Sequence, residues 1–173
     1  MSRVNPVKDC PACGSSAKPE PLYRKWGYQI CRCPDCRLGS TALDDHFDPA
    51  SIYSREYFDG SRADGYSDYL GSEPVLRKEF RSVVDSLVRS GRTSGSLFEI
   101  GSAYGFFLLE AQKHFAVRGV EACGDAAAHS REMGLDVVTG LVTPEALARR
   151  GPVDVVVLLD VIEHLTDPLG VLR

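Results

Sequence analysis

The stretch Leu97–Phe107, with the sequence LFEIGSAYGFF, decides the fold of this chain. Its first four residues are typical of a buried strand, the segment from Gly101 to Gly105 of a tight turn, and the apolar pair after it of a helix start. A second predicted strand ends at Glu121, where a carboxylate can accept both hydroxyls of a ribose. The turn lacks the Gly-x-Gly-x-x-Gly pattern that seats a pyrophosphate. The stretch therefore predicts a site for a ligand that has a ribose but no phosphates.

Apolar strands and helices alternate around this stretch. The predicted strands lie near 96–100, 116–121, 135–139 and 153–159. The predicted helices lie near 74–90, 104–115, 124–133 and 143–150. This alternation indicates an α/β fold with a Rossmann-like, doubly wound parallel sheet covered by helices on both faces. Ligands of such sheets bind at the carboxyl ends of the strands, where Gly101, Glu121, Gly140 and Asp160 fall.

Two Cys-x-x-Cys pairs near the N-terminus predict a metal site. The four residues are Cys10, Cys13, Cys33 and Cys36. Four thiolates can surround one Zn²⁺ tetrahedrally, and a chain without an export signal is expected to keep its thiols reduced. The pattern therefore predicts a small structural zinc ribbon, with ordinary buried or redox thiols as the alternative. Cys31 is a spare thiol that either substitutes as a ligand or simply packs.

Three segments, in order, resemble the class I S-adenosylmethionine (SAM)-dependent methyltransferases. The turn that follows Glu99 is similar to the first motif of that family, with Ala103 in place of the middle glycine. The strand end at Glu121 and the run 153–165, VDVVVLLDVIEHL, are similar to the second-strand end and to the fourth strand with its loop. The resemblance covers roughly residues 95–173 and implies SAM as the cofactor and methyl transfer as the activity.

The same resemblance implies roles for individual residues. The implied cofactor-binding residues are Glu99, Gly101, Ser102, Ala103, Gly105, Glu121, Ala122 and Asp160. In that family the turn would line the methionine end, Glu121 would hold the ribose, and His164 is a candidate catalytic base. Some O-methyltransferases carry Glu-x-x-Glu-His in the corresponding loop, so Mg²⁺ at Asp160, Glu163 and His164 is also an expectation. The alternative is that Glu163 and His164 are structural.

The sequence predicts three parts in the chain. They are the zinc ribbon over 1–40, a connecting segment over 41–71 and the cofactor-binding part of a methyltransferase domain over 72–173. The family's sheet has seven strands and this sequence supplies the first four, so we expect a truncated chain with weak or no activity. Its exposed sheet edge would allow self-association. Some sugar-modifying members carry a similar zinc module, which implies a small-molecule acceptor such as a sugar or natural-product intermediate.

Composition narrows the possible partners. A net charge of -4 gives no general attraction to nucleic acid or anionic membranes, and no segment approaches the ~20 apolar residues of a membrane span. We therefore expect a cytoplasmic enzyme. Basic residues near Tyr23, Trp26 and Tyr28 leave one alternative, a non-catalytic fragment whose ribbon binds a protein or nucleic-acid partner. Nucleic acid is the less favoured reading, and the sequence does not determine the acceptor or the oligomeric state.

Overall fold

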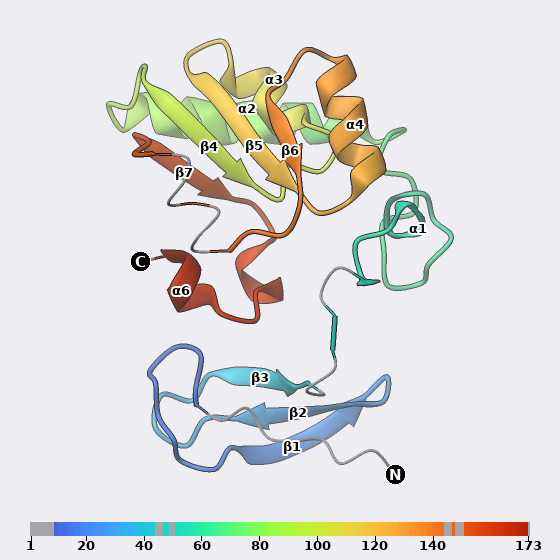
Figure 1. Cartoon of the computed structure of the whole chain (residues 1–173), viewed down its shortest axis with the longest axis vertical. Helices are drawn as coiled ribbons and strands as arrows, with labels where there is room; N and C mark the ends of the chain where they lie inside the picture. The colour runs from blue at the N-terminus through green and yellow to red at the C-terminus, as the bar shows by residue number, and fades with distance from the viewer. Residues whose placement is uncertain (1–8, 44–46, 49–50, 144–146, 148–150, 173) are drawn as a thin grey trace. The chain divides into compact units, whose positions relative to one another are not determined.

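The structure is a computed structural model (Figure 1). It describes residues 9–43, 47–48, 51–143, 147 and 151–172. The chain divides into two compact units, of which the larger is Ala50–His164 and the smaller combines Met1–Pro49 with Leu165–Arg173. No helix in these described ranges is both long enough and apolar enough to cross a membrane.

The smaller unit is built around an antiparallel sheet of three short strands. These are β1 (Glu20–Lys25), β2 (Tyr28–Arg32) and β3 (Gly39–Ala42), in the order β1-β2-β3. The hairpin between β1 and β2 turns at Trp26 and Gly27, which both have positive φ. Helix α6 (Pro168–Leu172) belongs to the same unit.

The larger unit contains a parallel sheet of four strands in the order β6-β5-β4-β7. The strands are β4 (Ser96–Ile100), β5 (Ala116–Glu121), β6 (Val137–Thr139) and β7 (Val155–Leu158). β4 is an inner strand with a partner on each side, as expected for a run whose last four residues are almost fully buried. This topology confirms the predicted α/β, Rossmann-like fold and places the carboxyl ends of all four strands at one edge.

Three helices pack on one face of this sheet (Figure 1). They are α2 (Glu73–Arg89), α3 (Phe106–Ala111) and α4 (Gly124–Glu132). The shared core joins strand residues such as Leu97 and Val137 to Val84 of α2 and Phe107 of α3. On the other face, a cavity of about 210 Å³ is lined by Phe98, Val120, Val138, Thr139, Gly140, Leu141, Val142 and Leu147. The helix expected over 143–150 lies mostly outside the described residues.

Several elements are shorter than the sequence predicts, among them helix α3 and strand β7. Helix α3 ends at Ala111, where the N–H groups of His114 and Phe115 both bond its carbonyl, and this tight turn carries the buried Phe115 into the core. Strand β7 begins at Val155, and the residue before it, Asp154, uses its side chain to contact β4. Its carboxylate accepts hydrogen bonds from the N–H and the hydroxyl of Ser96, at 2.7 and 2.8 Å, and so fixes the start of β4.

Residues 51–71, expected as a connecting segment, contribute to the core of the larger unit. After helix α1 (Arg55–Phe58) the chain folds back on itself, so that Tyr66 and Tyr69 donate N–H bonds to the carbonyls of Tyr57 and Phe58. Phe58 and Tyr69 are buried and belong to one cluster with Tyr104 and Phe106. The segment shows no helical or strand period because most of this packing is made from irregular backbone.

Candidate functional site

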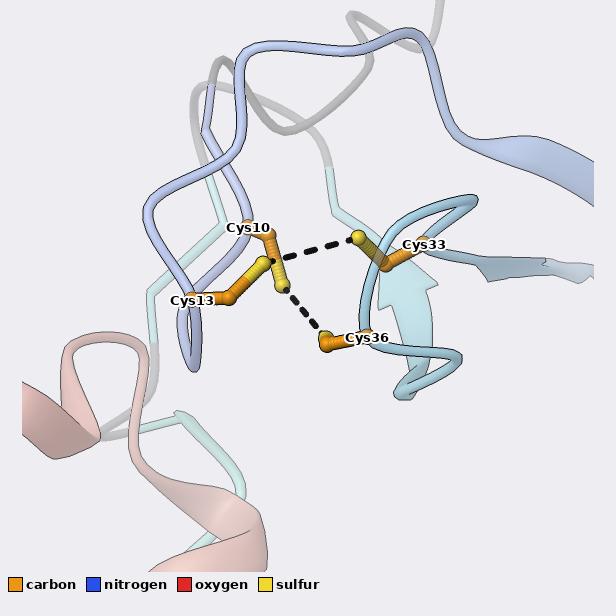
Figure 2. Close-up of side chains that lie close together, drawn as sticks. All are labelled: Cys10, Cys13, Cys33 and Cys36. Carbon is orange, nitrogen blue, oxygen red and sulfur yellow. Dashed lines mark hydrogen bonds between the residues drawn. The ribbon is translucent and has the colours of Figure 1, made fainter.

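The four predicted metal ligands meet in the smaller unit (Figure 2). All four sulfur atoms lie within 4.8 Å of one another, with 3.5 Å between Cys10 and Cys36 and 3.7 Å between Cys13 and Cys33. Tetrahedral Zn²⁺ with Zn–S bonds of about 2.3 Å would separate its sulfurs by about 3.8 Å. These distances are far longer than a disulfide bond, and all six cysteines are free. The group could therefore hold one zinc ion, and Cys31 lies outside it.

The two halves of this cluster have the same backbone design. In the first, the N–H of Cys10 bonds the carbonyl of Ser15 and the N–H of Gly14 bonds the carbonyl of Cys10; Cys33, Arg37 and Leu38 repeat the pattern. Gly14 and Arg37 also share a left-handed φ of 71° and 69°. Each turn thereby points two sulfurs the same way, and a hydrogen bond of 2.5 Å from the Ser15 hydroxyl to Asp35 joins the turns.

We expect the purified chain to carry one Zn²⁺ per molecule, measured by elemental analysis. Cys13→Ser should abolish stoichiometric zinc because three thiolates and a hydroxyl hold the ion much less tightly. Cys31→Ser is the matched control, since Cys31 is equally free but lies outside the sulfur group, and it should keep its zinc. A wild-type chain without zinc, or one with a disulfide between these cysteines, would contradict the assignment.

The predicted glycine turn of the larger unit is held by the neighbouring strand. The N–H groups of Gly101 and Ser102 both bond the carbonyl of Val120, and the N–H of Gly105 bonds the carbonyl of Ser102. Gly101, Ala103 and Gly105 all have left-handed φ, so the alanine adopts a conformation that usually favours glycine. An anion-binding turn presents free N–H groups to its ligand. Here these three donors and the N–H of Ala103, which bonds the Glu121 carboxylate, are used internally, which suits a ligand without phosphates.

Glu121 stands where the sequence places it and has a further role. Its side chain is only 4% exposed, and its two oxygens accept the N–H groups of Ala103 and Cys123, each at 2.7 Å. Burial raises the pKa of this carboxyl, and the backbone N–H bonds oppose that rise. Each oxygen keeps a second lone pair. Glu121 thus ties the turn to the start of α4 and still has acceptor capacity for hydroxyl groups.

Glu99 in β4 and Ser102 in the turn are buried polar residues without a full set of hydrogen-bond partners. Glu99 is 3% exposed, and neither its Oε2 atom nor the Ser102 hydroxyl has a hydrogen-bond partner among the described residues. Burial, followed by the nearby Glu121 carboxylate, raises the pKa of Glu99 well above its usual value. This shift favours the neutral form of Glu99, which can donate as well as accept a hydrogen bond.

This raised pKa predicts how stability changes with pH. The folded chain keeps a proton on Glu99 that the unfolded chain releases above about pH 4.3, so stability falls as pH rises toward the folded pKa, by up to about 1.4 kcal/mol per unit. Glu99→Gln should remove this part of the fall in urea unfolding at pH 5, 6 and 7. The exposed Glu132→Gln is the control. Equal pH slopes for wild type and Glu99→Gln would show that Glu99 is ionised in the folded state.

The loop after β7 presents residues to the same edge but does not form a metal group. Asp160 is exposed and has a left-handed φ of 55°, and Glu163 and His164 are exposed in a short 3-10 helix, Ile162–His164. Within the described ranges, the four cysteines are the one group of three or more side chains close enough to hold an ion. The expected Mg²⁺ site at Asp160, Glu163 and His164 therefore finds no support.

Tyrosines near this edge were not among the predicted site residues. The ring of His164 meets Tyr53 edge-on with 6.2 Å between centroids, and Tyr53 meets Tyr57 in the same way at 5.9 Å. Burial, with further contributions from Tyr57, Glu121 and Glu163, raises the pKa of Tyr53 to about 12. One feature of the sequence could have indicated these tyrosines, namely the high density of aromatic residues. Five of the seventeen residues in 53–69 are Tyr or Phe.

Comparisons with known proteins find structural similarity over part of the chain. No protein-family model and no curated protein sequence matches the chain. Among solved structures it resembles magnesium protoporphyrin IX methyltransferase (ChlM) from Synechocystis PCC 6803 with bound SAM, at 22% identity and a TM-score of 0.49, covering 71% of this chain and 67% of that one. The same enzyme with bound SAH gives 20% identity and 0.47, covering 65% and 57%.

A putative SAM-dependent methyltransferase (mmp1179) from Methanococcus maripaludis gives 15% identity and a TM-score of 0.42, covering 58% of this chain and 53% of that one. In two of these three comparisons the chain therefore spans less than two thirds of the other protein. All three identities are below 25% and all three TM-scores are below 0.5.

Proposed function

We propose that the chain is the cofactor-binding part of a SAM-dependent methyltransferase whose acceptor is a small molecule, a sugar or natural-product intermediate. The proposal rests on one observation above all. The turn Gly101–Gly105 with its left-handed residues, the buried carboxylate of Glu121 and the exposed Asp160 all follow strands of one parallel sheet, at its carboxyl edge. Such an edge is where ligands of this kind of sheet bind.

The residues at the edge suit the parts of this cofactor. Glu121 has lone pairs for the two ribose hydroxyls, and the half-buried Ala122 beside it would flank the adenine. The turn Gly101–Gly105 would line the methionine end above Glu99, and Asp160 would contact its ammonium group. When bound, SAM supplies a methyl group on a positively charged sulfur. The task of the chain is then to align this methyl group with the acceptor and to exclude water.

His164 is the candidate base. A hydroxyl acceptor must lose its proton as its oxygen takes the methyl group, and a neutral imidazole can accept that proton. His164 lies in the loop after β7, is exposed, and packs against Tyr53. The proton would move from the acceptor oxygen to a ring nitrogen of His164. Deprotonation of the acceptor would then not depend on hydroxide or another strong base from solution.

Glu121→Ala should weaken SAM binding by roughly 10- to 1000-fold in calorimetry on the whole chain, because two hydrogen bonds to a charged acceptor are lost. Glu121 also ties Ala103 to Cys123, so thermal unfolding of the variant is measured alongside. Glu132→Ala, an exposed glutamate of α4, is the control and should bind normally. Unchanged affinity in a folded Glu121→Ala variant would remove Glu121 from the site.

A second candidate function is partner binding by the ribbon, favoured by the exposed tip of its hairpin. Trp26 is 79% exposed, Tyr23 and Tyr28 are about half exposed, and the Lys25 ammonium lies 4.3 Å from the Trp26 ring centre. Exposed rings beside cations can stack on the bases of single-stranded nucleic acid. Protein partners also use such aromatic anchors.

The fluorescence of Trp26, the single tryptophan of the chain, reports directly on this tip. If the ribbon binds nucleic acid, a single-stranded oligonucleotide should quench it, the quenching should weaken with salt, and Lys25→Gln should bind less tightly. Lys78→Gln, an exposed lysine on helix α2, is the control. Fluorescence that is insensitive to the oligonucleotide would exclude nucleic acid as the partner.

A further inference from the structure

The hairpin between β1 and β2 carries a group of large apolar side chains that lie open to solvent. Residues 22–28 are here called the hairpin tip. Its members Leu22, Tyr23, Trp26 and Tyr28 are each at least 44% exposed, and all six residues of β1 are exposed. Large apolar groups gathered at one exposed place mark a contact surface.

The backbone at Trp26 is strained. Trp26 and Gly27 are the two central residues of the turn and have left-handed φ of 49° and 86°, as in type I′ turns. Asparagine, aspartate or glycine usually occupies the first of these positions, because other side chains are strained there. The turn would therefore be more stable with another residue in place of the tryptophan. A strained and exposed ring indicates a role outside the fold.

The hairpin tip is also locally basic. Residues 21–31 include Arg24 and Lys25 and no acidic residue. Among the described residues, neither of these two exposed cations forms an ion pair, whereas the neighbouring Arg32 pairs with Glu20 at 3.0 Å. The chain as a whole has a net charge of -4, but salt screens charges beyond about 8 Å. The two cations therefore act on whatever the hairpin tip touches.

The hairpin tip and the predicted metal group lie at opposite ends of β2. The strand leads from the tip at Tyr28 to Arg32, and the second cysteine turn begins at Cys33. A rise of about 3.3 Å per residue separates the two ends of the strand by about 13 Å. Figure 1 shows the β1–β2 turn projecting at one end of this sheet. A metal ion can thus fix the base of the hairpin while the tip stays open for contact.

We propose that the hairpin tip docks on the surface of a membrane that contains anionic phospholipids. Tryptophan and tyrosine rings favour the level of the lipid headgroups, where their apolar bodies and polar edges both find partners. Leu22 would add apolar contact, and Arg24 and Lys25 would pair with anionic headgroups. The contact is peripheral and reversible, since only a few side chains enter the interface. This inference is independent of the proposed methyl transfer.

Single-stranded nucleic acid fits the same features less well. The Lys25 ammonium lies 4.3 Å from the centre of the Trp26 ring and covers one of the two faces on which a base could stack. Leu22 offers a base no ring at all. Sites for single strands are also usually grooves that follow the nucleic-acid backbone, whereas the hairpin tip is a turn at the end of a sheet. These features favour a lipid surface.

The test is co-sedimentation of the whole chain with large vesicles of phosphatidylserine and phosphatidylcholine, mixed one to three, at about 0.1 M salt. We expect binding to these vesicles at least about ten-fold tighter than to vesicles of phosphatidylcholine alone. The emission of Trp26 should move to shorter wavelength on binding, because the ring leaves water. Lys25→Gln should weaken binding about five-fold, and Lys78→Gln on α2 is the control.

Trp26→Asn separates lipid contact from folding. Asparagine suits the left-handed turn, so the variant should unfold at the same or a higher temperature, yet bind the vesicles about ten-fold less tightly or worse. Leu22→Ala should weaken binding about three-fold or more. Val75→Ala, which shortens an exposed aliphatic side chain on α2, is its matched control and should bind normally.

A wild-type chain that does not sediment with the anionic vesicles overturns the inference, as does equal binding by a folded Trp26→Asn variant. Equal binding to both kinds of vesicle also overturns it, because the two cations would then have no role. If an oligonucleotide changes the fluorescence of Trp26 and the vesicles do not, the hairpin tip binds nucleic acid instead. SAM binding is measured separately, so none of these outcomes decides the proposed methyl transfer.

Discussion

The Glu121 carboxylate accepts one N–H from the turn after β4 and another from the residue that precedes α4, and the shape of the whole strand-end edge depends on these two bonds. Without an acceptor there, the N–H groups of Ala103 and Cys123 would be buried and unpaired, at a cost of about 1–3 kcal/mol each. The same carboxylate is the group best placed to bind ribose hydroxyls. Structural support and ligand recognition therefore draw on one side chain.

Glu99 shows how the edge tolerates a second carboxyl so close by. Two ionised groups in this low-dielectric position would repel each other. Burial favours the neutral form of Glu99, whereas the backbone N–H donors favour the ionised form of Glu121. Gly119, paired with Glu99 across the strands, makes room for this arrangement. A Cβ on Gly119 would lie about 3 Å from Leu108 and Ser102. The turn can therefore sit low against the sheet because its neighbour in β5 has no side chain.

The two central strands could be predicted because each is a short segment of mostly apolar residues. β4 and β5 match the expected ranges 96–100 and 116–121, and the spacing of Cys10, Cys13, Cys33 and Cys36 alone indicated a metal group. The packing of residues 53–69 could not be predicted in the same way, because most of its contacts are made from loops and its residues follow no period. Nor could a sequence show that backbone N–H groups already occupy Glu121. The expected magnesium ligands find no support, and proximity along a loop does not by itself bring side chains together.

Tyr53 lies near the first residue of the larger unit and His164 is its last residue, yet their rings pack edge-on against each other. The ends of a folded unit open more readily than its core, because fewer contacts must break there. Opening at either end would separate these two rings while β4 and the helices behind it remain packed. Access to the strand ends would then follow this local opening of the larger unit, and not the global stability of the sheet. Ligand exchange and fold stability could thus be altered independently by mutation.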